Sequence, residues 1–315
     1  MKKALSILIA GCLAVSLAAC GSTAASSAAS AADSTASAAE STAASDTAAA
    51  DGQTYKVGIC QLVQHVALDA ATQGFKDALT EQLGDAVTFE EKNAQGDSNT
   101  CTTIINGFVS DNVDLILANA TPALQAAQAG TNTIPVLGTS VTEYGVALGI
   151  DDFDGLVGTN ISGTSDLAPL DEQAGIIKEL FPDAKTVGLL YCSAEPNSQY
   201  QVDTVKASLE ELGYTCEYYA FSDSNDLATV CQSAADASDV IYVPTDNTVA
   251  NNTEIVNNIC QPAGVPVVAG EEGIMSGCGV ATLSISYYDL GVATGKMAAK
   301  ILTGESKVEE MPIEY

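Results

Sequence analysis

The sequence predicts an α/β protein with two similar lobes, each built on a parallel sheet that is covered by helices. From Tyr55 onward, short apolar runs alternate with helical patterns of about ten to fifteen residues, which is typical of parallel strands joined by crossover helices. Several apolar runs are continuous, as in sheets buried on both faces. The units form two successive series, so we expect two lobes with a ligand cleft at the carboxyl ends of their strands.

The first series begins at residue 55 and ends in a loop-rich passage beyond residue 138. We expect its strands at residues 55–60, 87–91, 114–118 and 135–138, and its helices at residues 67–83, 100–111 and 122–129. Gly84 suits the end of the first helix. Pro122 suits the first turn of the third helix, where its missing N–H leaves no hydrogen bond unmade.

The second series begins with a helix at residues 170–180. We expect its strands at residues 186–191, 215–220, 240–243 and 266–268, and its helices at residues 198–212, 227–233 and 248–260. Residues 280–285 then cross back, and one long helix follows at residues 287–303. The expected domains are lobe 1 at residues 55–163, lobe 2 at residues 164–284, and a return segment at residues 285–315 that packs on lobe 1.

The segment before the lobes is expected to be a signal peptide followed by a tether. Two Lys residues precede an apolar stretch that ends at Ala19 and is followed by Cys20, which fits a secretory signal at residues 1–19. The Cys position resembles the lipobox of bacterial lipoproteins and predicts lipidation at Cys20; the alternative is an ordinary cleavage site beside an incidental Cys. Residues 20–54 are rich in Ala, Ser and Thr, which predicts a flexible tether.

The composition restricts the kinds of ligand. The 315 residues include 11 Lys and no Arg against 40 acidic residues, for a net charge of −29, and 47% are hydrophobic. A large core is therefore expected, and nucleic-acid binding is not, because it depends on basic side chains. The absence of Arg also removes the usual bidentate clamp for a carboxylate or phosphate. An anionic ligand must then be held by backbone N–H groups, hydroxyls or a Lys.

Residues after the expected strands suggest a site for a zwitterion. Thr121 is expected to cap a helix whose N–H groups face the cleft, and Thr139 with Ser140 adds hydroxyls, which together suit a carboxylate. On the second lobe, Asp246 and Glu271 are acceptors suited to an ammonium group. An amino acid carries both groups. The alternative is that Thr121 only caps its helix and Asp246 only shapes a turn.

Further candidates at the strand ends are Gln61, His65 and Asn197, with Asn197 and Glu271 expected to bridge the closed lobes. His65 is the single His, and a lone His is more often structural than functional. Seven cysteines lie beyond residue 54 without metal-ligand spacing, so we expect most to be buried hydrophobes and neither a metal site nor a cofactor. The sequence leaves open whether one or two disulfides form, and it does not identify their partners. Nucleotide-binding, zinc-protease and esterase motifs are absent from the sequence, so no catalytic residues are expected.

Eight segments together resemble the substrate-binding lipoproteins of ABC transporters, in the family that includes tryptophan- and tyrosine-binding members. They are Gln61-x3-His65-x-Ala67-Leu68-Asp69, Ala118-Asn119-Ala120-Thr121-Pro122-Ala123, Gly138-Thr139-Ser140-Val141-Thr142, Gly163-Thr164-Ser165-Asp166, Leu190-Tyr191-Cys192-Ser193-Ala194-Glu195-Pro196-Asn197-Ser198, Val243-Pro244-Thr245-Asp246-Asn247-Thr248, Gly270-Glu271-Glu272-Gly273 and Thr282-Leu283-Ser284-Ile285-Ser286-Tyr287-Tyr288-Asp289-Leu290-Gly291.

This resemblance implies a type I periplasmic-binding-protein fold, with two Rossmann-like lobes joined by hinge strands around a central cleft. It also implies a lipid-anchored, extracytoplasmic monomer that delivers a small ligand, an aromatic amino acid in some members, to a membrane permease with a cytoplasmic ATPase. Members of the family usually continue beyond the last helix with a further strand, whereas this sequence stops at Tyr315. We therefore expect a truncated C-terminus and a missing third hinge crossing.

Three alternatives remain at this level. A sugar- or nucleoside-binding lipoprotein shares the expected fold, although the lack of Trp counts against sugar stacking. The sensory domain of a sugar-repressor-like regulator shares it too, but would carry a basic DNA-binding headpiece. A cofactor-free amino-acid racemase would need two thiols facing each other across the cleft, for which Cys60 and Cys192 are the candidates.

Overall fold

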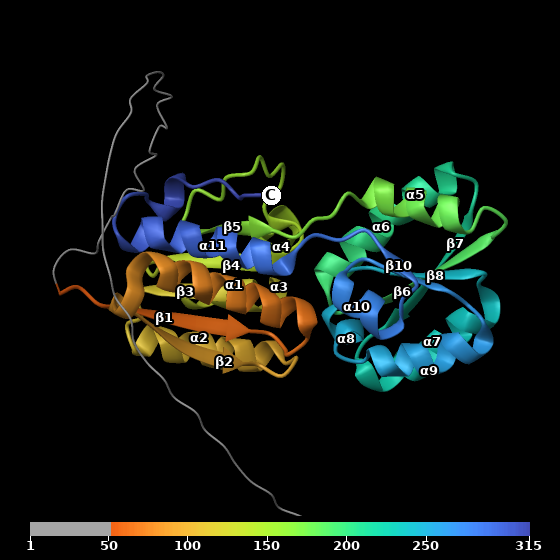
Figure 1. The fold of residues 1–315 in the computed structure, drawn as a ribbon, viewed down its shortest axis with the longest axis horizontal. Coiled ribbons are helices and arrows are strands. Elements are labelled where there is room, and N and C mark those ends of the chain that lie inside the picture. The colour runs from red at the N-terminus through yellow and green to blue at the C-terminus, as the bar shows by residue number, and fades with distance from the viewer. Residues whose placement is uncertain (1–51) are drawn as a thin grey trace, which may run out of the picture. The chain divides into compact units, whose positions relative to one another are not determined.

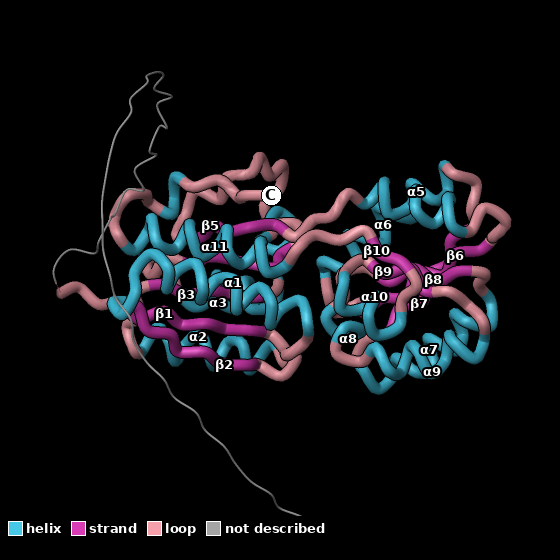
Figure 2. The backbone as a smooth tube through the Cα atoms, viewed as in Figure 1, coloured by secondary structure: helices cyan, strands magenta, loops and turns pink. Residues whose placement is uncertain are grey.

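The computed structural model describes residues 52–315 and shows two α/β lobes, each with a five-stranded parallel sheet (Figures 1 and 2). The expected signal peptide, Cys20 and nearly all of the expected tether lie outside the described residues. Between residues 52 and 315, none of the helices combines the length and apolar character that crossing a membrane requires.

Lobe 1 contains a parallel sheet in the order β2-β1-β3-β4-β5. Its strands are β1 (Tyr55–Gln61), β2 (Val87–Asn93), β3 (Leu115–Asn119), β4 (Val136–Val141) and β5 (Ile161–Ser165). Its helices are α1 (Val66–Leu83), α2 (Ser98–Ser110), α3 (Thr121–Gly130), α4 (Tyr144–Leu148) and α11 (Tyr287–Leu302). Gln61 pairs with both Asn93 and Asn119, and Asn119 with Thr139, so four carboxyl ends meet at one edge.

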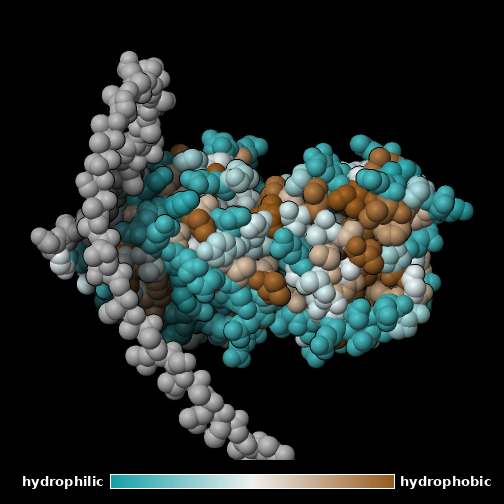
Figure 3. Space-filling view, viewed as in Figure 1, coloured by the Kyte–Doolittle hydropathy of each residue, from teal (hydrophilic) through white to brown (hydrophobic). Residues whose placement is uncertain are grey.

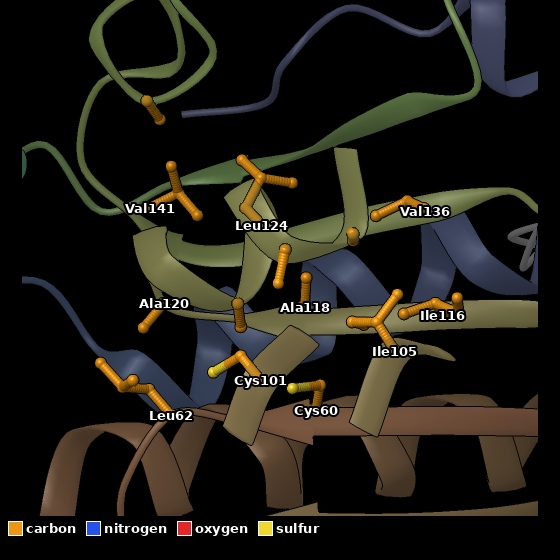
Figure 4. Packing of buried hydrophobic residues seen from close by; sticks show 14 of the residues in the cluster. Cys60, Leu62, Cys101, Ile105, Ile116, Ala118, Ala120, Leu124, Val136 and Val141 are labelled. Atoms are coloured by element: carbon orange, nitrogen blue, oxygen red, sulfur yellow. The ribbon is translucent and has the colours of Figure 1, made fainter. Parts of the chain in front are cut away.

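Helices cover both faces of this sheet. On one face, Cys60, Ile116 and Ala118 pack with residues of α2 and α3, as seen in Figure 4. On the other, Ile59 and Leu117 pack with residues of α1 and α11. Successive strand residues point to opposite faces, so burial on both faces explains why these strands read as continuous apolar runs.

Lobe 2 contains a second parallel sheet in the order β10-β9-β8-β6-β7. Its strands are β6 (Thr186–Cys192), β7 (Thr215–Phe221), β8 (Val240–Val243), β9 (Val267–Ala269) and β10 (Ala281–Thr282). Its helices are α5 (Leu170–Leu180), α6 (Pro196–Glu211), α7 (Ser224–Ala237), α8 (Asn247–Ala250), α9 (Thr253–Ala263) and α10 (Glu272–Cys278). Residues of α5 and α6 pack on one face, and residues of α7, α9 and α10 on the other.

The chain passes between the lobes twice within residues 52–315, once from β5 to α5 and once from β10 to α11. After the second passage, α11 packs against α1 in lobe 1. Two short 3₁₀ helices, η1 (Gly84–Ala86) and η2 (Val308–Glu310), complete the elements. Beyond η2 the chain runs beside β5, where Glu314 pairs with Thr164 and accepts a hydrogen bond from the Ser165 N–H.

Several elements differ from the sequence-based expectation. β5 lies in the passage expected to be loop, and the expected lobe boundary between residues 163 and 164 falls inside it. The helix expected at residues 248–260 is two helices, α8 and α9, with Asn251 and Asn252 between them. α4 and α10 are additional short helices. Residues 280–285 contain a strand of only two residues, Ala281 and Thr282.

The seven cysteines of the described residues are free, and six of them are buried. The sulfur atoms of Cys231 and Cys260 lie 3.7 Å apart in the core of lobe 2. Their packing agrees with the expectation of small buried hydrophobes.

Candidate functional site

A cleft of about 220 Å³ lies between the carboxyl ends of the two sheets. Lobe 1 contributes Leu62, Val63 and Pro122 to its walls, and lobe 2 contributes Glu195 and Asn247, among others. Each of these residues follows a strand or opens the helix after it. The sheet topology therefore gathers loops from both lobes where ligands of parallel α/β proteins usually bind.

The turn between β3 and α3 presents helix N–H groups to this edge. The expectation that Thr121 is the N-cap was wrong: α3 begins at Thr121, and Ala120 occupies the cap position. Ala120 has φ 92° and ψ 157°, a region that is almost confined to glycine, and no side chain caps the helix. Strained residues of this kind are concentrated at ligand sites. The uncapped N-terminus of a ten-residue helix is a favourable place for a carboxylate.

The two hydroxyls expected after β4 have different surroundings. The Thr139 hydroxyl accepts hydrogen bonds from Thr164 and Thr294 inside lobe 1. Ser140 is 7% exposed, has φ 54°, and its hydroxyl has no hydrogen-bond partner. The register between β4 and β5 shifts around it, between Gly138 and Val141. Ser140 is thus the member of the pair whose hydroxyl is available to a ligand.

Gln61 is held entirely within lobe 1. Its side-chain amide donates to the Val63 carbonyl and to Asp69, and its carbonyl accepts from Thr72. These bonds fix the N-terminal part of α1 on the end of β1. Its expected contact with a ligand stays a prediction, and its observed contacts are structural.

His65 joins the two lobes. Its Nε2 atom lies 3.2 Å from the side-chain carbonyl of Asn247, and the Asn247 amide donates to Glu195. Because Glu195 fixes the orientation of the amide, Nε2 is the donor and Nδ1 is an acceptor in the neutral ring. Nδ1 is buried and has no partner. Burial lowers the pKa of His65, which favours this neutral form.

Glu195 holds the beginning of α8. One carboxylate oxygen accepts from the Asn247 N–H and amide, and the other from the N–H and hydroxyl of Thr248. Glu195 belongs to one of the segments that carry the family resemblance, but it received no role from the sequence. Its position directly before Pro196 and α6 was the available signal, but its partners on α8 are distant in sequence.

Asp246 is engaged by the backbone of lobe 2. One carboxylate oxygen accepts from the Val249 N–H and caps α8, and the other accepts from the Cys192 N–H. Burial and the nearby charge of Glu195 raise the pKa of Asp246 to about 8. Glu271 is similar, since it caps α10 through the Gly273 and Ile274 N–H groups and burial raises its pKa. The expected ammonium contact of Asp246 stays a prediction.

Asn197 and Asp166 each keep one oxygen free. The Asn197 amide donates to the Thr245 carbonyl at 3.0 Å, while its side-chain oxygen has no partner. Asp166 follows β5 and accepts from the Tyr287 hydroxyl at 2.9 Å, while its Oδ1 atom has no partner. The recorded bonds of Asn197 and Glu271 stay within lobe 2. Asp166 received no role from the sequence, and only its place after Gly163-Thr164-Ser165 could have indicated one.

The thiols considered for a racemase do not face each other. Cys60 lies in the core of lobe 1 beneath α2, and Cys192 lies at the cleft wall in lobe 2. Burial raises the pKa of Cys192 to about 11, which disfavours the thiolate that such chemistry requires.

Pro122 in the first turn of α3 lines the cleft. The free Ser140 hydroxyl and the free oxygens of Asn197 and Asp166 belong to the carboxyl ends of the strands or to the segments that follow them. Groups of this kind suit binding of a polar molecule.

Comparison with known proteins gives one consistent family. Residues 56–315 match the model of the ABC transporter substrate binding protein family. The chain is 35% identical over 317 residues to the tyrosine-binding protein of Clostridioides difficile, an alignment that covers 99% of this chain and 87% of the relative. A structure from Streptococcus pneumoniae, solved in complex with L-Trp, is 33% identical, has a TM-score of 0.80, and is matched over 83% of this chain and 89% of the other.

An open structure provides a contrast. The ligand-free, open structure of a substrate-binding protein from Clostridium difficile is 40% identical and is matched over 82% of this chain and 88% of the other, but its TM-score is 0.61. The L-Trp complex is less similar in sequence and more similar in shape. In the structure of this chain, the His65–Asn247 hydrogen bond joins the two lobes.

Proposed function

Because this chain belongs to the family of ABC transporter substrate-binding proteins, we propose that its ligand is an amino acid, bound as a zwitterion between the lobes. Members of this family act outside the cytoplasm with an ABC transporter. The proposed ligand class is supported by the relatives, one described as tyrosine-binding and one solved with L-Trp. An aromatic amino acid such as tyrosine is the first candidate.

The observation that carries this proposal is a pair of unpaired hydrogen-bonding features in lobe 1. Ser140 offers a buried hydroxyl without a partner beside the uncapped N-terminus of α3. Helix N–H groups and a hydroxyl bind an anion without a basic side chain, as a chain without Arg requires. A carboxylate, with one charge, fits this modest positive potential better than a phosphate does.

The side chain of the ligand would lie in the cleft between Leu62, Val63 and Pro122 on one lobe and the loops of the other. The opposite wall includes polar residues such as Ser222 and Asn252, which suit a phenol hydroxyl or an indole N–H. Thr121 and Thr139 support the carboxylate site by shaping its two strand ends, and His65 holds the lobes together over the ligand.

We also propose that Cys20 carries a lipid anchor and that the receptor works as a monomer at the membrane. This part rests on the lipobox-like sequence before Cys20. A single anchored receptor can deliver its ligand to a permease within reach of the tether.

A thermal unfolding experiment tests the ligand class. Residues 52–315 would be heated with each amino acid, and with sugars and nucleosides, at about 1 mM. A ligand that binds with a dissociation constant of about 10 µM adds about 2.7 kcal/mol of stability, enough to raise the melting temperature by several degrees. We expect this for one or a few amino acids. Stabilisation by a sugar or nucleoside alone would contradict the proposal.

A further inference from the structure

Two thiols contact each other in the core of lobe 2. Cys231 lies on α7 and Cys260 on α9, with exposed fractions of 0% and 2%. Their sulfur atoms are 3.7 Å apart, within reach of a hydrogen bond from one thiol to the other. The residues packed around them are apolar, and neither thiol lines the cleft. The pair is therefore separate from the ligand site.

The other thiols of lobe 2 have different neighbours. Cys278 donates to a backbone carbonyl of its own helix, and Cys192 donates to a backbone carbonyl directly after β7. Cys216 lies on the opposite face of the sheet, among residues that pack with α5 and α6. Among the described thiols of this lobe, Cys231 and Cys260 are thus the two that form a hydrogen bond with each other.

The pair lies where two helices pack against each other. α7 and α9 are neighbours on one face of the sheet (Figure 1). The segments that lead into these helices line the cleft, with Asp223 before α7 and Asn252 before α9. The two cysteines are 29 positions apart in sequence, so a covalent bond between them would close a loop and restrict the unfolded chain. Such a bond would also hold together the two helices behind this wall of the cleft.

The compartment in which the family works favours such a bond. Substrate-binding proteins of ABC transporters act outside the cytoplasm, where disulfides form and persist, whereas cytosolic thiols are kept reduced. A pair of thiols already in contact needs only an oxidant that can reach it.

The oxidant must reach the pair before the core of lobe 2 is complete. Both thiols are buried in the folded protein, so a protein oxidant has no access to them there. The hydrogen bond to Cys260 and burial also raise the pKa of Cys231, which disfavours the thiolate that attacks a disulfide. In the unfolded chain, both thiols are accessible and have ordinary acidity.

We propose that Cys231 and Cys260 form a disulfide bond that links α7 to α9 when the protein folds outside the cytoplasm. The oxidant is the disulfide of an extracytoplasmic thiol oxidoreductase. One cysteine thiolate attacks that disulfide to give a mixed disulfide, and the second cysteine thiolate then displaces the oxidoreductase. The new S–S bond replaces the one that breaks, two electrons pass to the oxidoreductase, and its two sulfur atoms take up the two protons. The proposal does not depend on the identity of the ligand.

Peptide mapping tests for the bond directly. The full chain would be exported to the periplasm of a bacterial host and denatured in the presence of an alkylating reagent that blocks free thiols. Its peptides would be identified by mass spectrometry before and after reduction. We expect most chains to give a linked pair of peptides, containing Cys231 and Cys260, that reduction separates. Alkylation of both cysteines before reduction, or a link from either of them to Cys278, would overturn the proposal.

Urea denaturation with and without a thiol reductant tests the effect of the bond on stability. Because a cross-link restricts the unfolded chain, the reductant should lower the urea midpoint of the exported protein by about 1 M. The double variant Cys231→Ala with Cys260→Ala should lose this shift, whereas the control Cys216→Ala, which removes another buried thiol of lobe 2, should keep it. A shift of the same size in the double variant would contradict the assignment. Should the double variant not fold, the peptide map of the unmodified protein decides.

Discussion

Neighbouring hydroxyls at the end of β4 show how a single residue becomes available to a ligand. Thr139 and Ser140 are adjacent and buried, but the Thr139 hydroxyl is bonded to Thr164 and Thr294, whereas the Ser140 hydroxyl is free. The positive φ of Ser140 turns it out of the strand register. The strained backbone and the unpaired hydroxyl thus occur at the same residue.

Removing each hydroxyl should have a different effect. Ser140→Ala removes a hydrogen bond to a charged ligand group, worth about 1.5–3 kcal/mol, so amino-acid affinity should fall at least about 10-fold with little change in melting temperature. Thr139→Val removes hydrogen bonds inside lobe 1 and should lower the melting temperature with less effect on affinity. Calorimetry and thermal unfolding of both variants measure this. If Thr139→Val instead lowered the affinity and Ser140→Ala the melting temperature, the ligand would contact Thr139 and not Ser140.

The sequence predicted which residues reach the cleft better than it predicted their roles. Strand ends can be located from apolar runs, so Ser140, Asn197 and Asp246 were placed at this edge. Whether a carboxylate can bind a ligand depends on whether backbone N–H groups of distant segments already donate to it. The Cys192 N–H, for example, donates to Asp246. Asp166 was overlooked because β5 was not recognised as a strand, and its partner Tyr287 is 121 residues away.

At the level of elements, the close approach of α1 and α11 holds the return segment on lobe 1. A Cβ atom added to Gly291 would lie 2.0 Å from the Ala71 carbonyl oxygen, and one added to Gly74 would lie 2.1 Å from the Tyr288 carbonyl oxygen. The two helices thus touch through their backbones. Tyr287 at the start of α11 binds Asp166, so this packing also positions the crossing segments.

Two glycine variants test this contact. Gly291→Ala should lower the free energy of unfolding by about 1–3 kcal/mol, because the backbone must shift to admit the methyl group. The control Gly175→Ala lies on the exposed side of α5, where a Cβ atom meets nothing within 4 Å. It should raise stability by about 0.5–1 kcal/mol. Chemical denaturation of both variants measures the difference; a neutral Gly291→Ala would contradict the close packing.

Element prediction succeeded where burial produced a simple pattern. The apolar runs of β1, β3, β6 and β8 marked their strands because helices cover both faces of each sheet. β5, with the sequence Ile-Ser-Gly-Thr-Ser, carries small polar residues whose hydroxyls bond to β4, α11 and the C-terminal segment. Such a strand gives no apolar signal. The break between α8 and α9 lies at Asn251 and Asn252, where Asn252 takes the N-cap position of α9 and its amide donates to the Thr248 carbonyl.

Across the whole molecule, negative charge is divided between a solvated surface and a few buried carboxyl groups. Figure 3 shows hydrophilic residues over much of one face, with apolar residues exposed among them. The net charge of −29 is best explained as a property of this surface, where it opposes self-association. Asp166, Asp246 and Glu271 are instead buried, and burial raises the pKa of each.

These raised values predict how stability depends on pH in the absence of ligand. Between about pH 4, where an unfolded Asp titrates, and about pH 8, the value for Asp246, the Asp246 carboxyl binds a proton in the folded protein but not in the unfolded chain. The contribution of Asp246 to stability should therefore fall as pH rises through this range, by up to about 1.4 kcal/mol per pH unit. The lowered pKa of His65 acts in the opposite direction at about pH 6 to 7, so the Asp246 contribution is isolated by comparison with a variant. Urea denaturation at several pH values measures the slope.

Asp246→Asn should reduce this slope. Its overall stability should also fall, because the amide can accept from only one of the two N–H groups that Asp246 now binds. Asp183→Asn, at an exposed position, is the control and should leave the slope unchanged. A slope that Asp246→Asn leaves unchanged would show that Asp246 is ionised in the folded protein throughout this range.

The central claim is that the cleft binds an amino acid through both of its charged groups. Calorimetric titration of residues 52–315 with L-tyrosine, against tyramine and 3-(4-hydroxyphenyl)propionate, tests it directly. We predict saturable binding of one tyrosine per chain and binding at least about 100-fold weaker for each analogue, because each lacks one charged group. Binding of either analogue as tightly as tyrosine, or of a sugar or nucleoside in place of every amino acid, would contradict it.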